Sequence, residues 1–162
     1  MLNIFKKING MSIVGQGGKI ILFTLPSLLV AIFANTLIPQ IASLPIRYSF
    51  LKPLGYLLLV PGLIYWGTAV VQLLIGFSKG RLITTGAYAI ARNPIYSSVT
   101  FFVLPGVALI SQNWVYLVAA LFLFVGVQVF IGKEEHQLTE AFGKQYEDYL
   151  EKVNRLIPFA KG

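Results

Sequence analysis

The first 133 residues of this chain contain no acidic side chain, and four apolar segments occupy most of that length. The segments run from Lys19 to Pro45, from Leu54 to Phe77, from Ile95 to Ile110 and from Trp114 to Gly132. Crossing a bilayer takes about 20 mostly apolar residues, a length that the short third segment nearly reaches. Within a bilayer the backbone must satisfy its own hydrogen bonds, so each segment has to be helical. The sequence predicts an all-α, polytopic membrane protein with four transmembrane helices.

The apolar segments leave no room for a separate soluble domain, so we expect one integral membrane domain over residues 1–162. Its parts would be a cytosolic or interfacial lead-in (1–18), the first two spans (19–77) and a half that carries the functional site (78–158). Pro39 allows two interpretations of the first segment, a single span or a helix that ends near this proline. Pro61 predicts a kink in the second span.

The lysines and arginines predict the orientation. With the N-terminus in the cytosol, eleven of the 13 basic residues are cytosolic: Lys6, Lys7, Lys19, Lys79, Arg81, Arg92, Lys133, Lys144, Lys152, Arg155 and Lys161. Only Arg47 and Lys52 fall outside, so we expect both termini to be cytosolic and the protein to lie in the cell (inner) membrane. The net charge of +7 is then a matter of topology and of attraction to anionic membrane lipids. Nucleic-acid binding is not indicated, because no basic surface is interleaved with exposed aromatic residues.

The chain has no cysteine and a single histidine, His136. The missing thiols exclude disulfides and cysteine-bound metals. One imidazole cannot build a histidine metal cluster. We therefore expect no metal site.

All six acidic residues lie between Glu134 and Glu151, in a segment with helical periodicity. One face carries a mostly apolar and aromatic stripe: Glu135, Leu138, Phe142, Tyr146, Tyr149 and Val153. This pattern predicts an amphipathic helix that leaves the membrane after the fourth span and packs on the loop of residues 78–93. Gly143 interrupts the helix at some cost and predicts a kink.

Arg92-Asn93-Pro94 precedes the third span and suits the start of a helix, because Asn caps helices well and Pro favours the first helical position. A purely structural role is one interpretation. A second is that the helix start and Arg92 bind a carboxylate or phosphate of a ligand. Tyr88 and Tyr96 flank the turn, either as interface aromatics or as rings that face a cationic group.

Glu134 and Glu135 follow the fourth span directly. Neighbouring residues of a helix point about 100° apart, so the two carboxylates cannot share one face. Glu135 lies on the apolar stripe, where a carboxylate is costly unless it is paired. At least one of the two is therefore a candidate to bind ligand hydroxyls, a ligand ammonium or Arg92; a solvated pair is the alternative.

Taken together, these motifs resemble the signature of the isoprenylcysteine carboxyl methyltransferases and related phospholipid methyltransferases. The matching residues, in order, are Gly86 with Tyr88, Arg92-Asn93-Pro94-Ile95-Tyr96, Glu134-Glu135, Phe142-Gly143, Tyr146 with Tyr149, and Arg155-Leu156-Ile157-Pro158. The likeness covers residues 80–158, and the first two spans carry no part of the signature. Asn93 stands where the family has a histidine; its amide can donate a hydrogen bond, but it cannot take a proton at neutral pH.

The resemblance implies an integral membrane enzyme that uses S-adenosylmethionine, with a cofactor pocket closed by the C-terminal helix at the cytosolic surface. By position, the pocket would be lined by Leu82, Ile83, Tyr88, Asn93, Pro94, Tyr96 and Glu134. Glu134, Glu135 and Arg92 would be the catalytic residues. The acceptor would be a lipid-like or small hydrophobic molecule with a carboxylate, amine or thiol. Two alternatives are an NADPH-dependent membrane reductase of the steroid-reductase kind and a non-catalytic protein that keeps the fold.

Overall fold

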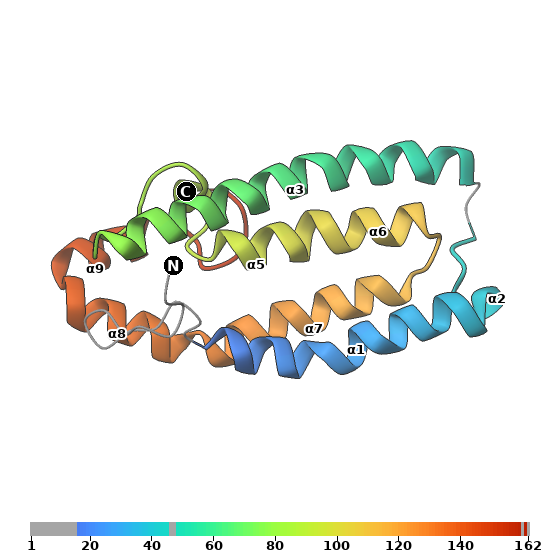
Figure 1. Ribbon diagram of the computed structural model, residues 1–162, viewed down its shortest axis with the longest axis horizontal. Helices are drawn as coiled ribbons and strands as arrows, with labels where there is room; N and C mark the ends of the chain where they lie inside the picture. The colour runs from blue at the N-terminus through green and yellow to red at the C-terminus, as the bar shows by residue number, and fades with distance from the viewer. Residues whose placement is uncertain (1–15, 46–47, 160, 162) are drawn as a thin grey trace.

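A computed structural model describes residues 16–45, 48–159 and 161 of the chain, and within this part the protein is built from helices (Figure 1). The elements are α1 (Gly17–Leu37), α2 (Pro39–Ala42), α3 (Tyr48–Ser78), α4 (Ala87–Ile90), α5 (Pro94–Ser98), the π-helical turn η1 (Val99–Val103), α6 (Leu104–Ile110), α7 (Val115–Phe130), α8 (Gly132–Phe142) and α9 (Lys144–Lys152). The predicted all-α class is confirmed. The predicted lead-in lies outside the described residues up to residue 15, and so does Arg47.

The long helices form an elongated bundle of two layers (Figure 1). One layer pairs α1 with α7, and the other packs α3 along α5, η1 and α6. The hairpin between α6 and α7 joins the layers. Residues 111–113 make its tight turn, in which the backbone N–H of Gln112 donates to the carbonyl of Leu109 at 3.3 Å.

Two helices, α1 and α3, are long and apolar enough to cross a membrane. The bent pair of α7 and α8 passes the same test if it is counted as one span, and Pro94–Ile110 is a shorter apolar helix. Many large apolar side chains of α1 and α3 are exposed, among them Leu22 and Leu57. Such surfaces suit contact with lipid, since water-soluble monomers rarely expose large apolar patches.

Prolines shape these helices in different ways. The first long helix ends at Leu37, two residues before Pro39. Of the two interpretations of the first segment, the helix that ends near this proline is therefore the correct one. A residue that precedes proline is disfavoured in helical geometry, which explains the break. By contrast, α3 starts at Tyr48, earlier than predicted, and it continues as one helix through Pro53 and Pro61.

The third apolar segment contains the π-helical turn η1, in which the backbone N–H of Leu104 bonds to the carbonyl of Val99. Pro105 lies just beyond and has no backbone N–H to offer the preceding turn, so a regular ladder cannot continue there. Close packing holds this segment against α3. An added Cβ on Gly106 would lie 2.9 Å from the carbonyl oxygen of Gly55, so neither glycine has room for a side chain.

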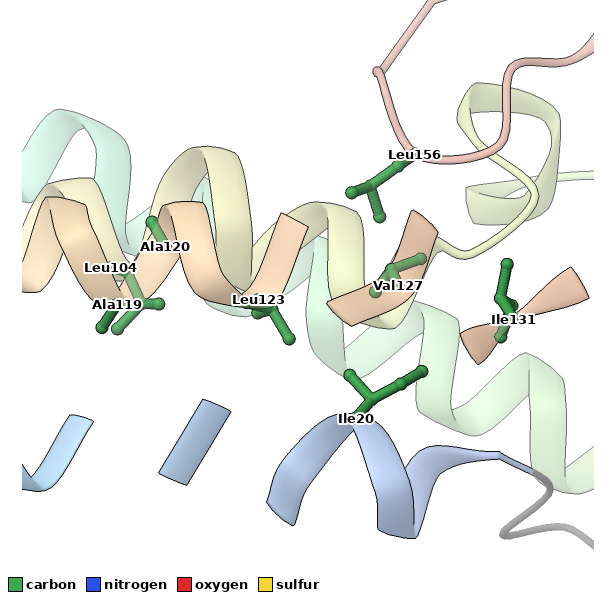
Figure 2. Close-up of a cluster of buried hydrophobic side chains, with 8 residues drawn as sticks. All are labelled: Ile20, Leu104, Ala119, Ala120, Leu123, Val127, Ile131 and Leu156. Carbon is green, nitrogen blue, oxygen red and sulfur yellow. The ribbon is translucent and has the colours of Figure 1, made fainter. Parts of the chain in front are cut away.

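The main core lies between α1 and α7 and is built from Ile20, Leu104, Ala119, Ala120, Leu123, Val127, Ile131 and Leu156 (Figure 2). Leu156 comes from the tail that follows α9, and 1% of its surface is exposed. A second cluster joins Tyr146, Tyr149 and Val153, with Leu82 packed against it. The predicted contact between the aromatic stripe and the loop of residues 78–93 is thus confirmed.

Hydrogen bonds close the hairpin end of the bundle. Asn113 is buried, and its Nδ2 donates to the carbonyl of Ala31 at 2.9 Å while its Oδ1 accepts from the N–H of Val115 at 2.9 Å. The backbone N–H of Trp114 donates to the carbonyl of Ala42 at 3.1 Å. These contacts tie the hairpin to α1 and α2.

The opposite end carries the charged helices. After Phe130 the chain bends by 45° into α8, so α8 does not continue the axis of α7. At Gly143, whose φ is +53°, the helix breaks again and α9 begins. A positive φ is easy only for glycine, so the kink predicted there is confirmed.

Candidate functional site

Three segments that are distant in sequence meet at the charged end of the bundle. They are the start of α1, the loop and turn that lead into α5, and the start of α8. Gln16 donates its backbone N–H to Oε2 of Glu134 at 3.2 Å, which joins the first segment to the third. Glu134 also lies near enough to Tyr88 and Tyr96 to interact with both electrostatically, so the loop and turn before α5 join the other two segments.

Glu135 is enclosed by two arginines. Arg92 Nη2 donates to Glu135 Oε1 at 2.8 Å, and Arg155 approaches in a bidentate manner, with Nη2 at 2.5 Å from Oε2 and Nε at 3.2 Å from Oε1. The side chains of Arg92 and Glu135 are only 9% and 12% exposed. Arg92 Nη1 also donates to the carbonyl of Leu150 at 3.1 Å. Glu135 therefore pairs with Arg92, one of the partners that the sequence allowed, and Arg155 is an additional partner that the sequence analysis did not foresee.

The tail after α9 docks on the turn that starts α5. The backbone N–H groups of Arg92 and Asn93 donate to the carbonyls of Asn154 and Arg155 at 2.9 and 3.1 Å. Asn93 Nδ2 donates to the same carbonyl of Arg155 at 3.1 Å. The amide of Asn93 thus acts as a hydrogen-bond donor to the chain itself. Pro94 follows as the first residue of α5 and is fully buried.

Glu134 has a different environment from its neighbour. Burial raises the pKa of its carboxyl above the ordinary 4.5, the hydrogen bond from Gln16 opposes this shift, and the charge of Glu135 adds to it. Glu134 makes no ion pair with any described residue. Its carboxylate can therefore still accept a charged donor, whereas the carboxylate of Glu135 is already paired with two arginines. Gly17 at the start of α1 packs closely against Tyr96, because an added Cβ on this glycine would lie 2.7 Å from the Tyr96 hydroxyl.

The loop before α5 is held from both sides. Gln72 of α3 accepts the backbone N–H of Ala87 at 3.0 Å through Oε1, next to Gly86 with φ +62°. The hydroxyl of Tyr149 donates to the carbonyl of Tyr88 at 2.5 Å. Burial and the nearby charge of Glu134 raise the pKa of the Tyr88 phenol.

Leu82 and Ile83, the two apolar residues predicted to line the site, have contacts outside the group of Glu134 and the tyrosines. Leu82 contacts the cluster of Tyr146, Tyr149 and Val153. Ile83 lies against α3, since an added Cβ on Gly76 would lie 2.3 Å from its side chain. The polar members, by contrast, converge: Tyr88, Tyr96 and Glu134 form one group.

Among the described residues, four buried side-chain atoms have no hydrogen-bond partner: Tyr65 OH, Arg92 Nε, Ser97 Oγ and Thr100 Oγ1. The hydroxyls of Tyr65 and Ser97 lie close enough to interact, but not with the geometry of a hydrogen bond. Tyr65, Ser97, Thr100 and Gly17 were not among the residues predicted from sequence. The spacing of Ser97 and Thr100, three residues apart just after Tyr96, could have marked a polar face on the third span.

The chemistry that this arrangement offers is that of carboxylates, phenols and hydroxyls. No group of three or more His, Asp or Glu side chains within residues 16–45, 48–159 and 161 could hold a metal ion. An ionised carboxylate near two tyrosine rings suits a ligand with positive charge and hydroxyl groups.

A family model, that of the phospholipid methyltransferases, matches residues 55–145, which is more than half of the 162-residue chain. The match covers most of α3, a helix in which sequence analysis found no part of the signature, and it ends before Arg155. No curated protein matches the chain.

Proposed function

Because this chain belongs to the phospholipid methyltransferase family, a family of membrane methyltransferases, we propose that it transfers the methyl group of S-adenosylmethionine to a lipid-like or small hydrophobic acceptor. The observation that carries the proposal is the convergence of Glu134, Tyr88 and Tyr96 at one end of the bundle. The acceptor would carry a carboxylate, amine or thiol.

The residues present fit S-adenosylmethionine. Glu134 would bind its ammonium or ribose hydroxyls, because this buried carboxylate has no ion-pair partner among the described residues. The rings of Tyr88 and Tyr96 would face the sulfonium, a contact worth roughly 0.5 to 2 kcal/mol. Arg92 Nε is a buried donor without a partner and suits the carboxylate. When bound, the cofactor supplies an activated methyl group.

The chain's own contribution would be to hold the reactants together and exclude water. Positioning of this kind can supply roughly 7 to 11 kcal/mol, so no covalent nucleophile is required. The acceptor's lone pair forms the bond to the methyl carbon, and the electrons of the broken carbon–sulfur bond stay on sulfur. A carboxylate or thiolate needs no base. An amine must also lose a proton, for which Glu134 is placed best, since the Glu135 carboxylate already accepts from two arginines.

Glu135 and Arg92 would act as positioning residues. Their ion pair joins α8 to the turn before α5, and Arg155 joins the tail to both. These ion pairs would hold α8, which carries Glu134, in a fixed position relative to α5, which carries Tyr96. Leu82, Ile83, Asn93 and Pro94 would shape the same site from the loop and the turn.

In the membrane, we place four spans: α1, α3, the segment Pro94–Ile110, and α7. The charged helices α8 and α9 would then lie at the cytosolic face, with both termini on that side. Support comes from the charges, because all six acidic residues and most described basic ones lie at this end, while Lys52 lies near the hairpin end. This distribution agrees with the positive-inside rule.

Thermal unfolding in detergent tests the proposal directly. S-adenosylhomocysteine at about 100 times its Kd should stabilise the protein by about 2.7 kcal/mol, and NADPH should give no shift. Glu134→Gln should weaken the stabilisation, with Glu140→Gln on the exposed face of α8 as the matched control. Transfer of tritium from labelled cofactor to a lipid extract would then identify the product. Stabilisation by NADPH alone would replace this proposal with the reductase.

A further inference from the structure

The buried hydroxyls of the membrane helices are of two kinds. Thr24 and Ser98 each donate to a carbonyl of their own helix at 2.8 Å, as helical hydroxyls often do. Ser97 and Thr100 are 0% and 6% exposed, and neither hydroxyl has a hydrogen-bond partner among the described residues. The oxygens of Ser97 and Thr100 can therefore accept a bond from a ligand.

A third oxygen of this kind comes from α3. The hydroxyl of Tyr65 is buried without a hydrogen bond, and it lies close to Ser97. The Tyr65 ring meets Phe102 edge-on with centroids 6.2 Å apart, which holds the phenol against the third span. Thr100 follows Ser97 by three residues, the spacing of neighbours on one helix face. Buried polar groups are rarely left unsatisfied, so this hydroxyl trio of Tyr65, Ser97 and Thr100 indicates a ligand.

The hydroxyl trio adjoins the group of Glu134 and the tyrosines. Ser97 directly follows Tyr96, which interacts electrostatically with Glu134. Tyr88 interacts electrostatically with both Glu134 and Tyr65. A molecule bound to the trio would therefore have a carboxylate and the proposed cofactor site beside it. This is the place in which the proposed function needs the methyl acceptor.

Charge and hydrogen-bonding capacity select among the three kinds of acceptor. Glu134 has no ion-pair partner among the described residues, so it attracts a cation and repels a carboxylate or a thiolate. A primary ammonium has three N–H donors and no acceptor. The trio offers three oxygens that can accept, one for each of these donors. An amine is therefore the acceptor that the site matches.

The transfer to an amine balances with groups that the site already contains. The ammonium first gives one proton to an oxygen of Glu134, and the second oxygen of this carboxylate stays available to the cofactor. The neutral amine keeps two N–H bonds to the trio, while its lone pair forms the bond to the methyl carbon. The electrons of the broken carbon–sulfur bond stay on sulfur. The product is a methylated ammonium, and Glu134 later releases its proton to water.

Each methyl group replaces one N–H donor and leaves one more oxygen of the trio unsatisfied. At the moment of attack, a primary amine has two N–H donors, a secondary amine has one and a tertiary amine has none. We propose that Tyr65, Ser97 and Thr100 bind the nitrogen of an amine acceptor and limit how many methyl groups it receives, so that a primary amine is favoured and a monomethylated product is released. The inference rests on the proposed function for the cofactor and the transfer step.

Acceptors that already carry different numbers of methyl groups test this assignment. The full chain is placed in nanodiscs of phosphatidylcholine, whose nitrogen takes no further methyl group. It receives S-adenosylmethionine with hexadecylamine, N-methylhexadecylamine or N,N-dimethylhexadecylamine, and mass spectrometry measures the products. We expect kcat/KM to fall about tenfold for each methyl group already present, the effect of one lost hydrogen bond.

A second series distinguishes a lipid headgroup from a simple long-chain amine. It uses phosphatidylethanolamine and its N-methyl and N,N-dimethyl forms. We expect the same order of preference in whichever series the enzyme methylates faster. Equal kcat/KM across that series, or a preference for its methylated members, would overturn the inference.

Variants of the trio separate selectivity from structure. Ser97→Ala combined with Thr100→Val should lower kcat/KM about tenfold more for the primary than for the dimethylated amine, so that multiply methylated products accumulate. Tyr65→Phe keeps the ring, should change the preference in the same direction, and carries the test if the double variant does not fold. Ser98→Ala combined with Thr24→Val removes two hydroxyls that already have partners and should retain the original preference. An equal loss for all three amines in the trio variants would show a structural role and overturn the inference.

Binding of S-adenosylhomocysteine separates this inference from the proposed function. A protein that binds it but methylates none of the amines would overturn the inference and leave the proposed function with a carboxylate or thiol acceptor. A protein that neither binds it nor transfers methyl groups would refute the proposed function itself.

Discussion

The two ends of the bundle treat their buried polar groups in opposite ways. At the hairpin end, the Asn113 side chain donates to one carbonyl and accepts from one N–H, both within the chain. At the charged end, Glu134 has no ion-pair partner among the described residues, and the buried atoms Arg92 Nε and Ser97 Oγ lack hydrogen bonds. Unsatisfied buried groups cost stability unless something binds them. The comparison indicates that one end holds the bundle closed and that the other is prepared for a ligand.

Within the charged end, two adjacent carboxylates divide these tasks. Glu135 is bound by two arginines, and Glu134 points about 100° away along the helix, toward the tyrosines. The difference yields predictions that separate stability from ligand binding.

The largest effect should come from Glu135→Ala. Removing one member of a buried ion pair leaves its partners uncompensated, so the free energy of unfolding should fall by about 3–5 kcal/mol. Denaturant unfolding in micelles would measure this loss. Glu134→Ala is the control and should lower stability far less, because no arginine depends on it. Equal losses in the two variants would remove the distinction between the carboxylates.

The second largest loss of stability should come from Asn113→Ala. It deprives the Ala31 carbonyl and the Val115 N–H of their partner, at a cost of about 1–3 kcal/mol. Affinity for S-adenosylhomocysteine should not change, since this residue lies at the far end of the bundle. Ser111→Ala, which removes a hydroxyl bonded to its own helix at 2.7 Å, provides the local control. A weaker cofactor affinity in Asn113→Ala would show that the two ends are coupled.

Much of this layout was predictable from sequence, because it depends on local patterns. Pro39 breaks a helix through its effect on the preceding residue, and Gly143 permits a conformation that other residues avoid. The ion pair of Arg92 with Glu135 could be predicted from sequence as one of several possible pairings, since a carboxylate on an apolar stripe needs a partner.

Other features depend on packing between distant segments, which a single sequence does not encode locally. Arg155 reaches Glu135 only because Gly143 and the loop after α9 turn the chain back. Gly17 lies beside the Tyr96 hydroxyl although the two are in different spans. Tyr65 and Ser97 are ordinary membrane-helix residues until the packing of α3 on α5 brings them together.

Gly17→Ala should have a smaller effect that is restricted to activity. The added Cβ would lie 2.7 Å from the Tyr96 hydroxyl and would force the phenol to move. Since catalysis is sensitive to small misplacements, we expect kcat/KM for methyl transfer to fall about tenfold. Gly18→Ala meets nothing within 4 Å and is the matched control. Similar activity in both variants would mean that Tyr96 does not need its present position.

The pH dependence of cofactor binding should be the mildest signal. Burial raises the pKa of Glu134 above 4.5, so this carboxyl takes up a proton at a higher pH than in the unfolded chain. As the pH falls through the raised pKa, the ionised form that binds an ammonium is lost, and affinity for S-adenosylhomocysteine should decline. The same shift makes Glu134 lower the stability of the fold as the pH rises from its unfolded to its folded pKa.

Calorimetric titrations at several pH values would check the dependence. In Glu134→Gln the decline should disappear. A persisting decline in that variant would assign the titration to another group.

Hydrogen–deuterium exchange in nanodiscs with and without S-adenosylhomocysteine, read out by mass spectrometry, tests whether the three segments at the charged end form one site. We expect slower exchange at residues 16–20, 86–96 and 132–138 together, with no change at residues 111–115. Cofactor that binds without protecting these three segments, or that protects the hairpin end instead, would contradict a shared site at the charged end.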